Sequence, residues 1–116
     1  MNTEDFRKYC LLKKGVTEEF PFDEHTLVFK VKGKMFALTG FGFPFTVNLK
    51  CDPERAAELR ERYEDITPGF HMNKKHWNTV NFEGGVPDKI LKELIDHSYK
   101  LVVNGLNKKF RDELDL

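Results

Sequence analysis

The chain has 116 residues, of which 40% are hydrophobic and 33% are charged, a composition typical of one globular domain rather than of a disordered chain. Its 19 basic and 19 acidic residues cancel, which excludes a uniformly basic protein that coats DNA. No segment approaches the roughly 18 apolar residues of a membrane span, and the charged first 14 residues lack a signal-peptide core. We therefore expect a single domain over residues 1–116, in the cytoplasm.

A short helix is predicted at the start of the chain, because Thr3 can serve as its N-cap and two acidic residues follow. Two lysines and Gly15 form a stop signal behind it. Residues 16–25 are then predicted as a connecting loop, with Phe20-Pro21-Phe22 in its middle. We expect the two phenylalanines to cover the edge of the core, and the alternative is an exposed interaction patch.

Three strands are predicted next, at 26–32, 35–39 and 45–50, because apolar and polar residues alternate in each. Gly33 supplies the hairpin turn between the first two. A two-residue loop at either 32–33 or 33–34 puts Phe36 and Leu38 on the face of Phe29. A glycine-aromatic loop spans 40–44. In the third strand we expect three residues inward and three outward: Phe45, Val47 and Leu49 against Thr46, Asn48 and Lys50.

The second half begins with Asp52-Pro53, which predicts a helix N-terminus, and this helix ends before the turn at 67–69. Residues 70–72 are expected as a short strand, 73–76 as a turn and 77–82 as a further strand. In that strand Val80 and Phe82 face one side, and Trp77, Thr79 and Asn81 face the other.

The strongest helical signal begins at Pro87 and ends at Asn104-Gly105. Its wide apolar stripe should form the main helical wall of the core, through Ile90, Leu91, Leu94, Ile95, Ser98, Leu101 and Val102. A short charged tail from about residue 106 is expected either to fray or to dock through Leu106 and Phe110.

The order α-β-β-β-α-β-β-α predicts an α+β fold. Short connections between strands favour an antiparallel sheet. Because every strand alternates, we expect a two-layer sandwich with helices on one face of the sheet and the other face largely open.

Charge is distributed unevenly along the chain. The windows 26–51 and 66–82, which hold the predicted strands, contain six basic residues and no acidic ones: Lys30, Lys32, Lys34, Lys50, Lys74 and Lys75. The remaining segments hold the other 13 basic residues and all 19 acidic ones. The predicted strands are therefore basic, and the helices, loops and tail are acidic.

Strand parity predicts that a basic and polar surface forms on the open face. We expect the lysines to neutralise phosphates while Trp77 stacks on an unpaired base, which makes the surface a candidate nucleic-acid site. Its residues are Lys30, Lys32, Lys50, Lys74, Lys75, His76, Trp77 and Thr79. The alternative is a merely solvated sheet, because acidic residues are disfavoured in strands, edge lysines prevent aggregation, and Trp77 can pack under a loop or the tail.

Catalytic and metal-binding patterns are weak. His71 and His76 could approach each other across a turn, but no further ligands for zinc accompany them. Cys10 lies on the apolar face of the first helix and is expected to be a core residue. Cys51 precedes a helix N-terminus, which can lower a thiol pKa, yet no histidine base accompanies it. We expect no enzyme, no metal and no cofactor.

Six segments carry a resemblance that covers nearly the whole chain: Gly15-Val16-Thr17-Glu18 with Phe20-Pro21-Phe22, Leu27 to Val31, Lys34 to Ala37, Asn48 to Pro53, His71 to Val80, and Leu94 to Tyr99. In this order they resemble the MmcQ/YjbR family of small bacterial proteins. The resemblance implies a CyaY-like or secretion-chaperone-like sandwich and a DNA-binding label. That label rests on analogy of fold, and fold does not fix function.

Three hypotheses for function remain open. The first is a DNA- or other nucleic-acid-binding module that uses the basic face. The second is a protein-interaction or chaperone-like module that uses the Phe20–Phe22 loop, the 40–45 loop or a sheet edge. The third is a sensor with a small-molecule pocket between the sheet and the last long helix. We expect a monomer without a membrane partner.

Overall fold

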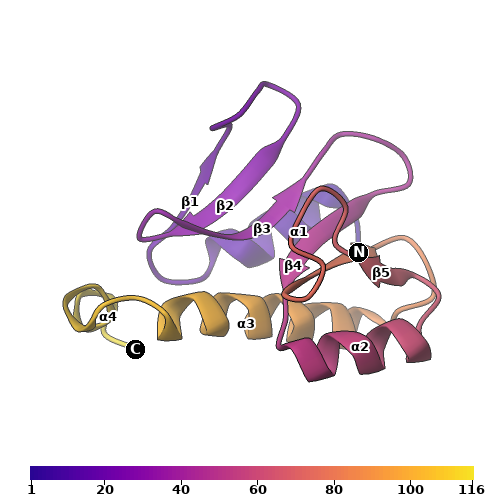
Figure 1. Cartoon of the computed structure of the whole chain (residues 1–116). Coiled ribbons are helices and arrows are strands. Elements are labelled where there is room, and N and C mark those ends of the chain that lie inside the picture. The colour runs from indigo at the N-terminus through magenta and orange to yellow at the C-terminus, as the bar shows by residue number, and fades with distance from the viewer.

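The computed structural model describes all residues, 1–116, and contains four helices and six strands (Figure 1). The helices are α1 (Thr3–Leu11), α2 (Pro53–Arg62), α3 (Asp88–Asn104) and α4 (Lys108–Leu114). The strands are β1 (Val16–Glu19), β2 (Leu27–Val31), β3 (Lys34–Thr39), β4 (Thr46–Lys50), β5 (Ile66–Pro68) and β6 (Trp77–Asn81).

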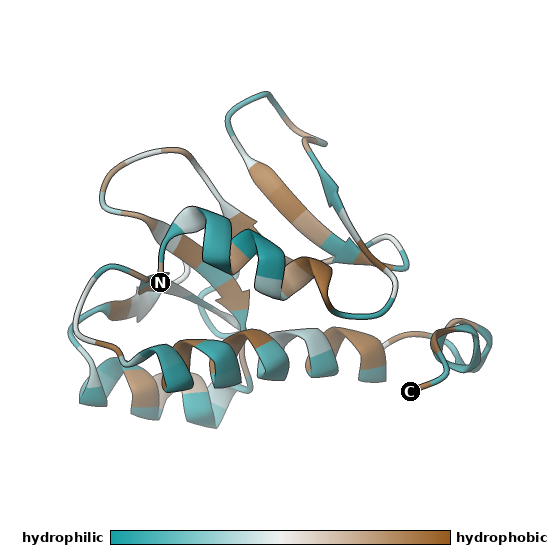
Figure 2. Ribbon diagram, turned by 180° about the vertical axis from the view of Figure 1, so that it is seen from behind, coloured by the Kyte–Doolittle hydropathy of each residue, from teal (hydrophilic) through white to brown (hydrophobic).

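The strands form one antiparallel sheet in the order β1-β2-β3-β4-β6-β5. The helices pack against it to give the predicted two-layer α+β sandwich, and seen from behind, α1 lies across the sheet with α3 beneath it (Figure 2). The element order is α-β-β-β-β-α-β-β-α-α. Two elements, β1 and α4, are therefore additional to the order predicted from the sequence. No helix combines the length and the apolarity that crossing a bilayer requires.

The first additional element is β1, in a segment that we predicted as a loop. Val16 and Glu18 alternate with Thr17 and Glu19, and β1 pairs with β2 along its whole length. The strand is short, lies at the edge of the sheet and is largely hydrophilic beside the apolar β2 (Figure 2). Such an edge strand carries no apolar run, so its sequence lacks the usual strand signal.

The predicted facing of Leu38 is wrong, because β3 contains a β-bulge. Phe29 lies opposite Ala37 while Lys30 lies opposite Met35, so Phe36 is left without a partner of its own. The extra residue reverses the parity of the strand beyond it. Phe36 shares the core with Phe29 as predicted, but Leu38 lies on the opposite face.

The bulge is stabilised by Ser98 of α3, which is fully buried. Its hydroxyl donates to the carbonyl of Phe36 and accepts from the Lys50 amide, at 2.9 Å in the second contact. One serine thus satisfies two main-chain groups that the irregular register leaves without strand partners.

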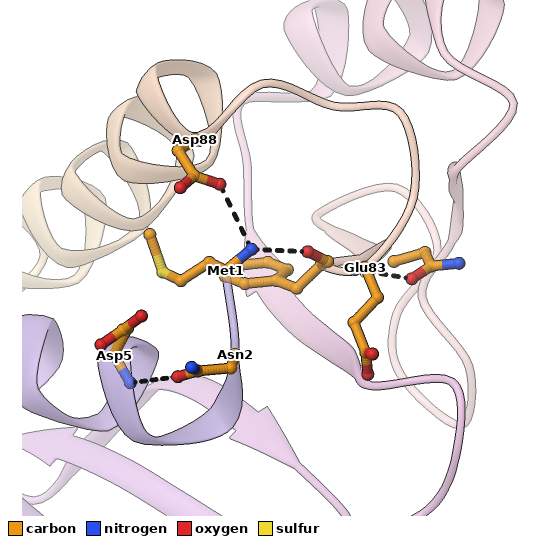
Figure 3. Close-up of polar contacts among 7 residues, drawn as sticks. Met1, Asn2, Asp5, Glu83 and Asp88 are labelled. Atoms are coloured by element: carbon orange, nitrogen blue, oxygen red, sulfur yellow. Dashed lines mark hydrogen bonds and ion pairs between the residues drawn. The ribbon is translucent and has the colours of Figure 1, made fainter.

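Side chains cap the helices at three of the four N-termini. Asn2, not the predicted Thr3, caps α1, because its Oδ1 accepts from the Asp5 amide at 2.8 Å. The Met1 amino group beside it donates to the carbonyl of Phe82 and to Asp88 (Figure 3). Asn107 caps α4 through the amide of Phe110.

The predicted cap of α2 is confirmed. Asp52 accepts a hydrogen bond from the Arg55 amide, and Pro53 occupies the first turn. The Asp52 amide in turn donates to Nε2 of His97 on α3. Burial and the nearby Arg55 lower the pKa of His97, which favours the neutral ring that can accept this bond.

The main core lies between the sheet and the helices and holds 22 buried residues. Phe6 of α1 occupies its centre, with edge-to-face contacts to Phe29, Phe45 and Phe82 at centroid distances between 5.3 and 5.6 Å. The inward positions of β4 and of the predicted strand at 77–82 are confirmed, since Val47, Leu49, Val80 and Phe82 all belong to this core.

The charged tail forms α4 and docks on the domain. Leu106 and Leu114 are buried, and Leu114 packs beside Gly15 at the start of β1. Phe110 is only partly covered, under the ammonium of Lys32. The docking expectation is therefore confirmed for Leu106, while Leu114 provides an anchor that we did not predict.

Candidate binding groove on the open face of the sheet

The face opposite the helices is partly covered by the loop between β5 and β6. The predicted strand at 70–72 is wrong, because the strand is β5 at Ile66–Pro68 and the following residues turn back. In Figure 1 this loop lies in front of the sheet, with α1 behind it. Residues 69–76, called the covering loop below, therefore decide what the open face can bind.

Trp77 lies under the covering loop and is only 8% exposed. It packs in a small cluster with Val28 and Leu38, which Met35 and Met72 cover. The main chain of Gly69 touches it directly: the Gly69 amide donates to the Trp77 carbonyl at 2.9 Å. A buried indole cannot stack on a base, so the role predicted for Trp77 is wrong in this structure.

Polar residues of the sheet hold the covering loop in place. The Phe70 amide donates to Thr79 Oγ1 at 2.9 Å, Thr79 donates to Asn48, and the Asn48 amide returns to the Phe70 carbonyl at 3.2 Å. These three residues close a ring of hydrogen bonds. Thr79, predicted as a nucleic-acid contact, instead positions Phe70.

The far end of the covering loop is fixed by Arg60 of α2. Its guanidinium donates to Oδ1 of Asn78 and to the carbonyls of Lys74 and Trp77. The Lys74 ammonium itself donates to the Gly69 carbonyl at 2.8 Å, across the loop. Arg60 thus attaches one end of the loop to α2, and Lys74 joins the two ends of the loop to each other, through hydrogen bonds from charged donors, which are stronger than neutral ones.

The structure separates the five lysines of the predicted basic surface. Lys30 pairs with Glu19 at 3.5 Å, and Lys32, in the β2–β3 turn, pairs with Glu113 of α4 at 2.7 Å. Lys50 lies at the end of β4 opposite Trp77, while Lys75 and the half-buried His76 lie in the covering loop. Among the lysines of the predicted basic surface, therefore, only Lys50, Lys74 and Lys75 form no ion pair.

A groove of about 620 Å³ opens beside the covering loop, and it is the candidate site. It also reaches the loops that join β1 to β2 and β3 to β4, called the hairpin loops below. Its volume lies within the usual range for ligand pockets, about 300–1,000 Å³. Apolar side chains and polar side chains both contribute. Its lining residues are Phe22, Asp23, Thr26, Met35, Leu38, Thr39, Gly40, Thr46, Asn48, Phe70, His71, Met72 and Thr79.

Five phenylalanines of the covering loop and the two hairpin loops have exposed fractions between 50% and 90%, and two of them, Phe22 and Phe70, line the groove; we call the five the aromatic rim. They are Phe20, Phe22, Phe41, Phe43 and Phe70. Phe20 stacks on Phe41 at a centroid distance of 6.0 Å, so the two hairpin loops lie side by side. The expectation that Phe20 and Phe22 cover the core is wrong, because both point into solvent. Single exposed apolar residues are ordinary, whereas several on neighbouring loops are a feature of interaction surfaces.

His71 adds a conformational sign of function to the groove. Its φ is +57°, in the left-handed region that non-glycine residues rarely adopt. This backbone turn brings its ring against that of Phe70, with centroids 4.0 Å apart. Strained backbone of this kind concentrates at binding sites, where the surrounding structure maintains it.

The two cysteines, the metal-ligating residues and a second cavity show fewer features of a functional site. Burial raises the pKa of Cys51 to about 11 and also raises that of Cys10, so the lowered thiol pKa considered for Cys51 is wrong. No group of three or more metal-ligating side chains comes together. A second cavity, beneath α4, has Leu114 as its one hydrophobic lining residue, and the Lys32–Glu113 ion pair lies in it.

Comparison with known proteins identifies the family. The family model YjbR matches residues 11–101. The chain belongs to the YjbR family. It is 34% identical over 113 residues to the uncharacterized protein YjbR of Escherichia coli K12, which covers 96% of this chain and 95% of that protein. It is also 42% identical over 92 residues to the uncharacterized protein YbdF of E. coli O157:H7, covering 78% and 75%.

Solved structures share the fold of this YjbR-family chain. The Deinococcus radiodurans protein DR2400, with a DUF419 domain, superposes with a TM-score of 0.93 at 46% identity, covering 99% of this chain and 88% of that one. A Pseudomonas syringae protein superposes with a TM-score of 0.77 at 29% identity, covering 87% and 98%. The resemblance inferred from sequence motifs is thus confirmed at the level of family and fold.

The sequence pointed to part of this site. The phenylalanines beside proline and glycine in the two hairpin loops were considered as an interaction surface, and four of the five rim residues come from those loops. Phe70 was missed, because its segment was predicted as a strand. A sequence signal was nevertheless present, since Pro68-Gly69 next to it indicates a turn.

Proposed function

We propose that this protein is a non-catalytic interaction module that holds a segment of a partner protein in the groove on the open face of the sheet. The observation that supports this proposal is a groove lined by the exposed rings of Phe22 and Phe70 and by Met35, Leu38 and Met72, with three further exposed phenylalanines in the neighbouring hairpin loops. Exposed aromatic and methionine side chains are the residues that enrich protein interfaces.

The chemistry of the groove favours a polypeptide. Methionine side chains adapt to differently shaped apolar groups. Polar side chains also line the groove, and the Thr46 hydroxyl and the Asn48 amide among them suit the amides and carbonyls of a main chain. A groove of about 620 Å³ accommodates a short segment and not a folded domain, so we expect an extended or turn-like segment to enter it.

A selection experiment tests this proposal. A library of random 12-residue peptides displayed on phage is selected against the immobilised protein, and the enriched peptides are measured by fluorescence anisotropy. We expect apolar and aromatic peptides, with affinity reduced at least about tenfold in a Phe22→Ser/Phe70→Ser variant, as for central interface residues. Leu12→Ser is the matched control, because Leu12 is 83% exposed and lies outside the groove.

Two results would overturn the proposal. Peptides that bind the Phe22→Ser/Phe70→Ser variant as tightly as the wild type, or no enrichment at all, contradict a binding role for the groove. A urea denaturation curve for each variant separates lost binding from lost folding, and both exposed positions are expected to leave stability within about 0.5 kcal/mol.

Nucleic-acid binding is the competing proposal, and Lys50, Lys74 and Lys75 favour it because they form no ion pair. Two observations oppose it: the indole of Trp77 is buried and cannot stack on a base, and Lys30 and Lys32 are paired with acidic residues. Anisotropy with labelled single- and double-stranded oligonucleotides at low salt discriminates the two proposals. Saturable binding that falls steeply with salt and disappears in Lys50→Glu/Lys75→Glu would favour nucleic acid.

A further inference from the structure

The groove contains one carboxylate, and His71 is its other titratable side chain. Asp23 is its only acidic lining residue, and neither lysine nor arginine contributes to the lining. Asp23 forms no ion pair, whereas the neighbouring Glu24 lies 3.8 Å from His25. An unpaired carboxylate beside apolar surface is an open position for a cation from a ligand.

The local backbone fixes Asp23 in its charged form. The amide of His25 donates to Asp23 Oδ1 at 2.8 Å. This main-chain bond, together with bonds from Thr26, lowers the pKa of the Asp23 carboxyl. The carboxylate is therefore oriented by its own loop and remains ionised near neutral pH.

Two aromatic rings line the same groove as this carboxylate. Phe22 precedes Asp23 in the chain and lines the same groove, and Phe70 lines it from the covering loop. Both rings are about two-thirds exposed. A guanidinium pairs with a carboxylate through two parallel hydrogen bonds and stacks flat on aromatic faces, whereas an ammonium lacks this planar fork and meets the carboxylate as a point charge.

We propose that the groove recognises an arginine side chain flanked by apolar residues in the partner segment, with Asp23 as the residue that selects the charge. This inference rests on the proposed function. The guanidinium lies against Asp23 and the rings of Phe22 and Phe70, and the flanking apolar side chains contact Met35 and Met72.

Three labelled hexapeptide pools test the inference. The pools share one apolar composition and differ at a central position, which is arginine, glutamine or glutamate. We expect the wild-type protein to bind the arginine pool about five- to tenfold more tightly than the glutamate pool, with a preference that weakens at high salt.

Two variants assign this preference to a residue. Asp23→Asn keeps an oxygen acceptor for the His25 amide but removes the charge, and we expect the arginine preference to fall to about twofold or less while binding of the glutamine pool is unchanged. Glu24→Gln is the matched control, because this adjacent carboxylate lies outside the groove lining, and it should keep the preference.

The outcomes separate the inference from the proposed function. Equal binding of the three pools to the wild type overturns the arginine preference and leaves the groove as a general apolar site. A preference that survives in Asp23→Asn overturns the role of Asp23. Failure of every pool to bind contradicts the inference and the proposed function together, whereas binding of an isolated arginine derivative as tightly as the peptides contradicts the requirement for a partner segment.

Discussion

Gly69 provides the sharpest test of how the covering loop encloses Trp77. A Cβ atom at this position would lie 2.8 Å from Trp77 Cβ, 2.9 Å from the Trp77 carbonyl oxygen and 3.1 Å from Met72 Cβ. Carbon atoms prefer separations of about 3.5–4.0 Å, so Gly69→Ala forces the loop away from β6 by roughly 0.5–1 Å. The two closest contacts are to β6 near its main chain, which a side-chain rotation cannot relieve.

We expect Gly69→Ala to lower the free energy of unfolding by about 1–3 kcal/mol, the usual cost of overpacking. The midpoint of urea denaturation should then fall by about 1 M. Trp77 is the only tryptophan, so its fluorescence monitors the transition, and the native emission should move to longer wavelength as the indole becomes wetter.

Gly42→Ala is the matched control, because nothing lies within 4 Å of the Cβ it adds and its φ is not positive. Its midpoint should stay within the error of the wild type. Equal midpoints and equal emission for the two variants would refute the close contact between Gly69 and β6, and with it the burial of Trp77.

Three further predictions concern the rest of the fold. Ser98→Ala should cost about 2–4 kcal/mol in urea denaturation, because two buried main-chain groups lose their partner; a loss below about 0.5 kcal/mol would contradict the role of this hydroxyl at the bulge. His97 has a folded-state pKa below its unfolded value, so its contribution to stability is complete above about pH 6.5 and declines as the pH falls further. His97→Gln should remove this part of the slope in the stability measured between about pH 7 and pH 5, and an unchanged slope would argue against the bond to the start of α2. Cys10 and Cys51, both buried with raised pKa values, should react with a thiol reagent such as DTNB only at the rate of unfolding, and rapid labelling of native protein would show that a thiol is accessible.

Periodicity predicted the parts of the fold in which the apolar pattern is unbroken. The inward residues of β4, the Asp52 cap of α2 and most of the α3 stripe are where the sequence indicated, although Tyr99 and Val103 are buried in place of the predicted Leu101. Each is specified by residues close together in the chain, so a short sequence window contains the whole signal.

The errors have a common physical origin in tertiary contacts. Leu38 was assigned to the wrong face because a bulge that Ser98 stabilises from another element reverses the strand parity. The edge strand β1 exists through its pairing with β2 and carries no apolar run of its own. Leu114 is buried through contact with Gly15, about a hundred residues earlier in the chain.

Prediction of the candidate site was also limited by contacts between elements that are distant in the chain. The sequence placed Trp77 on the correct face, opposite Val80. Whether that face is open depends on the covering loop, which Arg60 and the Asn48–Thr79 pair hold over it from other elements. Aromatic residues in loops were therefore a better guide to the groove than the charge of the strands.

Mapping by ¹⁵N NMR of a selected apolar, arginine-containing 12-residue peptide bound to the full chain tests the central claim most directly. The account predicts that amide shifts change in the hairpin loops and the covering loop, including Asp23, Leu38 and Met72, which line the groove. Changes confined to the helical side, or centred on Lys50 and Lys75 with the groove residues unmoved, would contradict it.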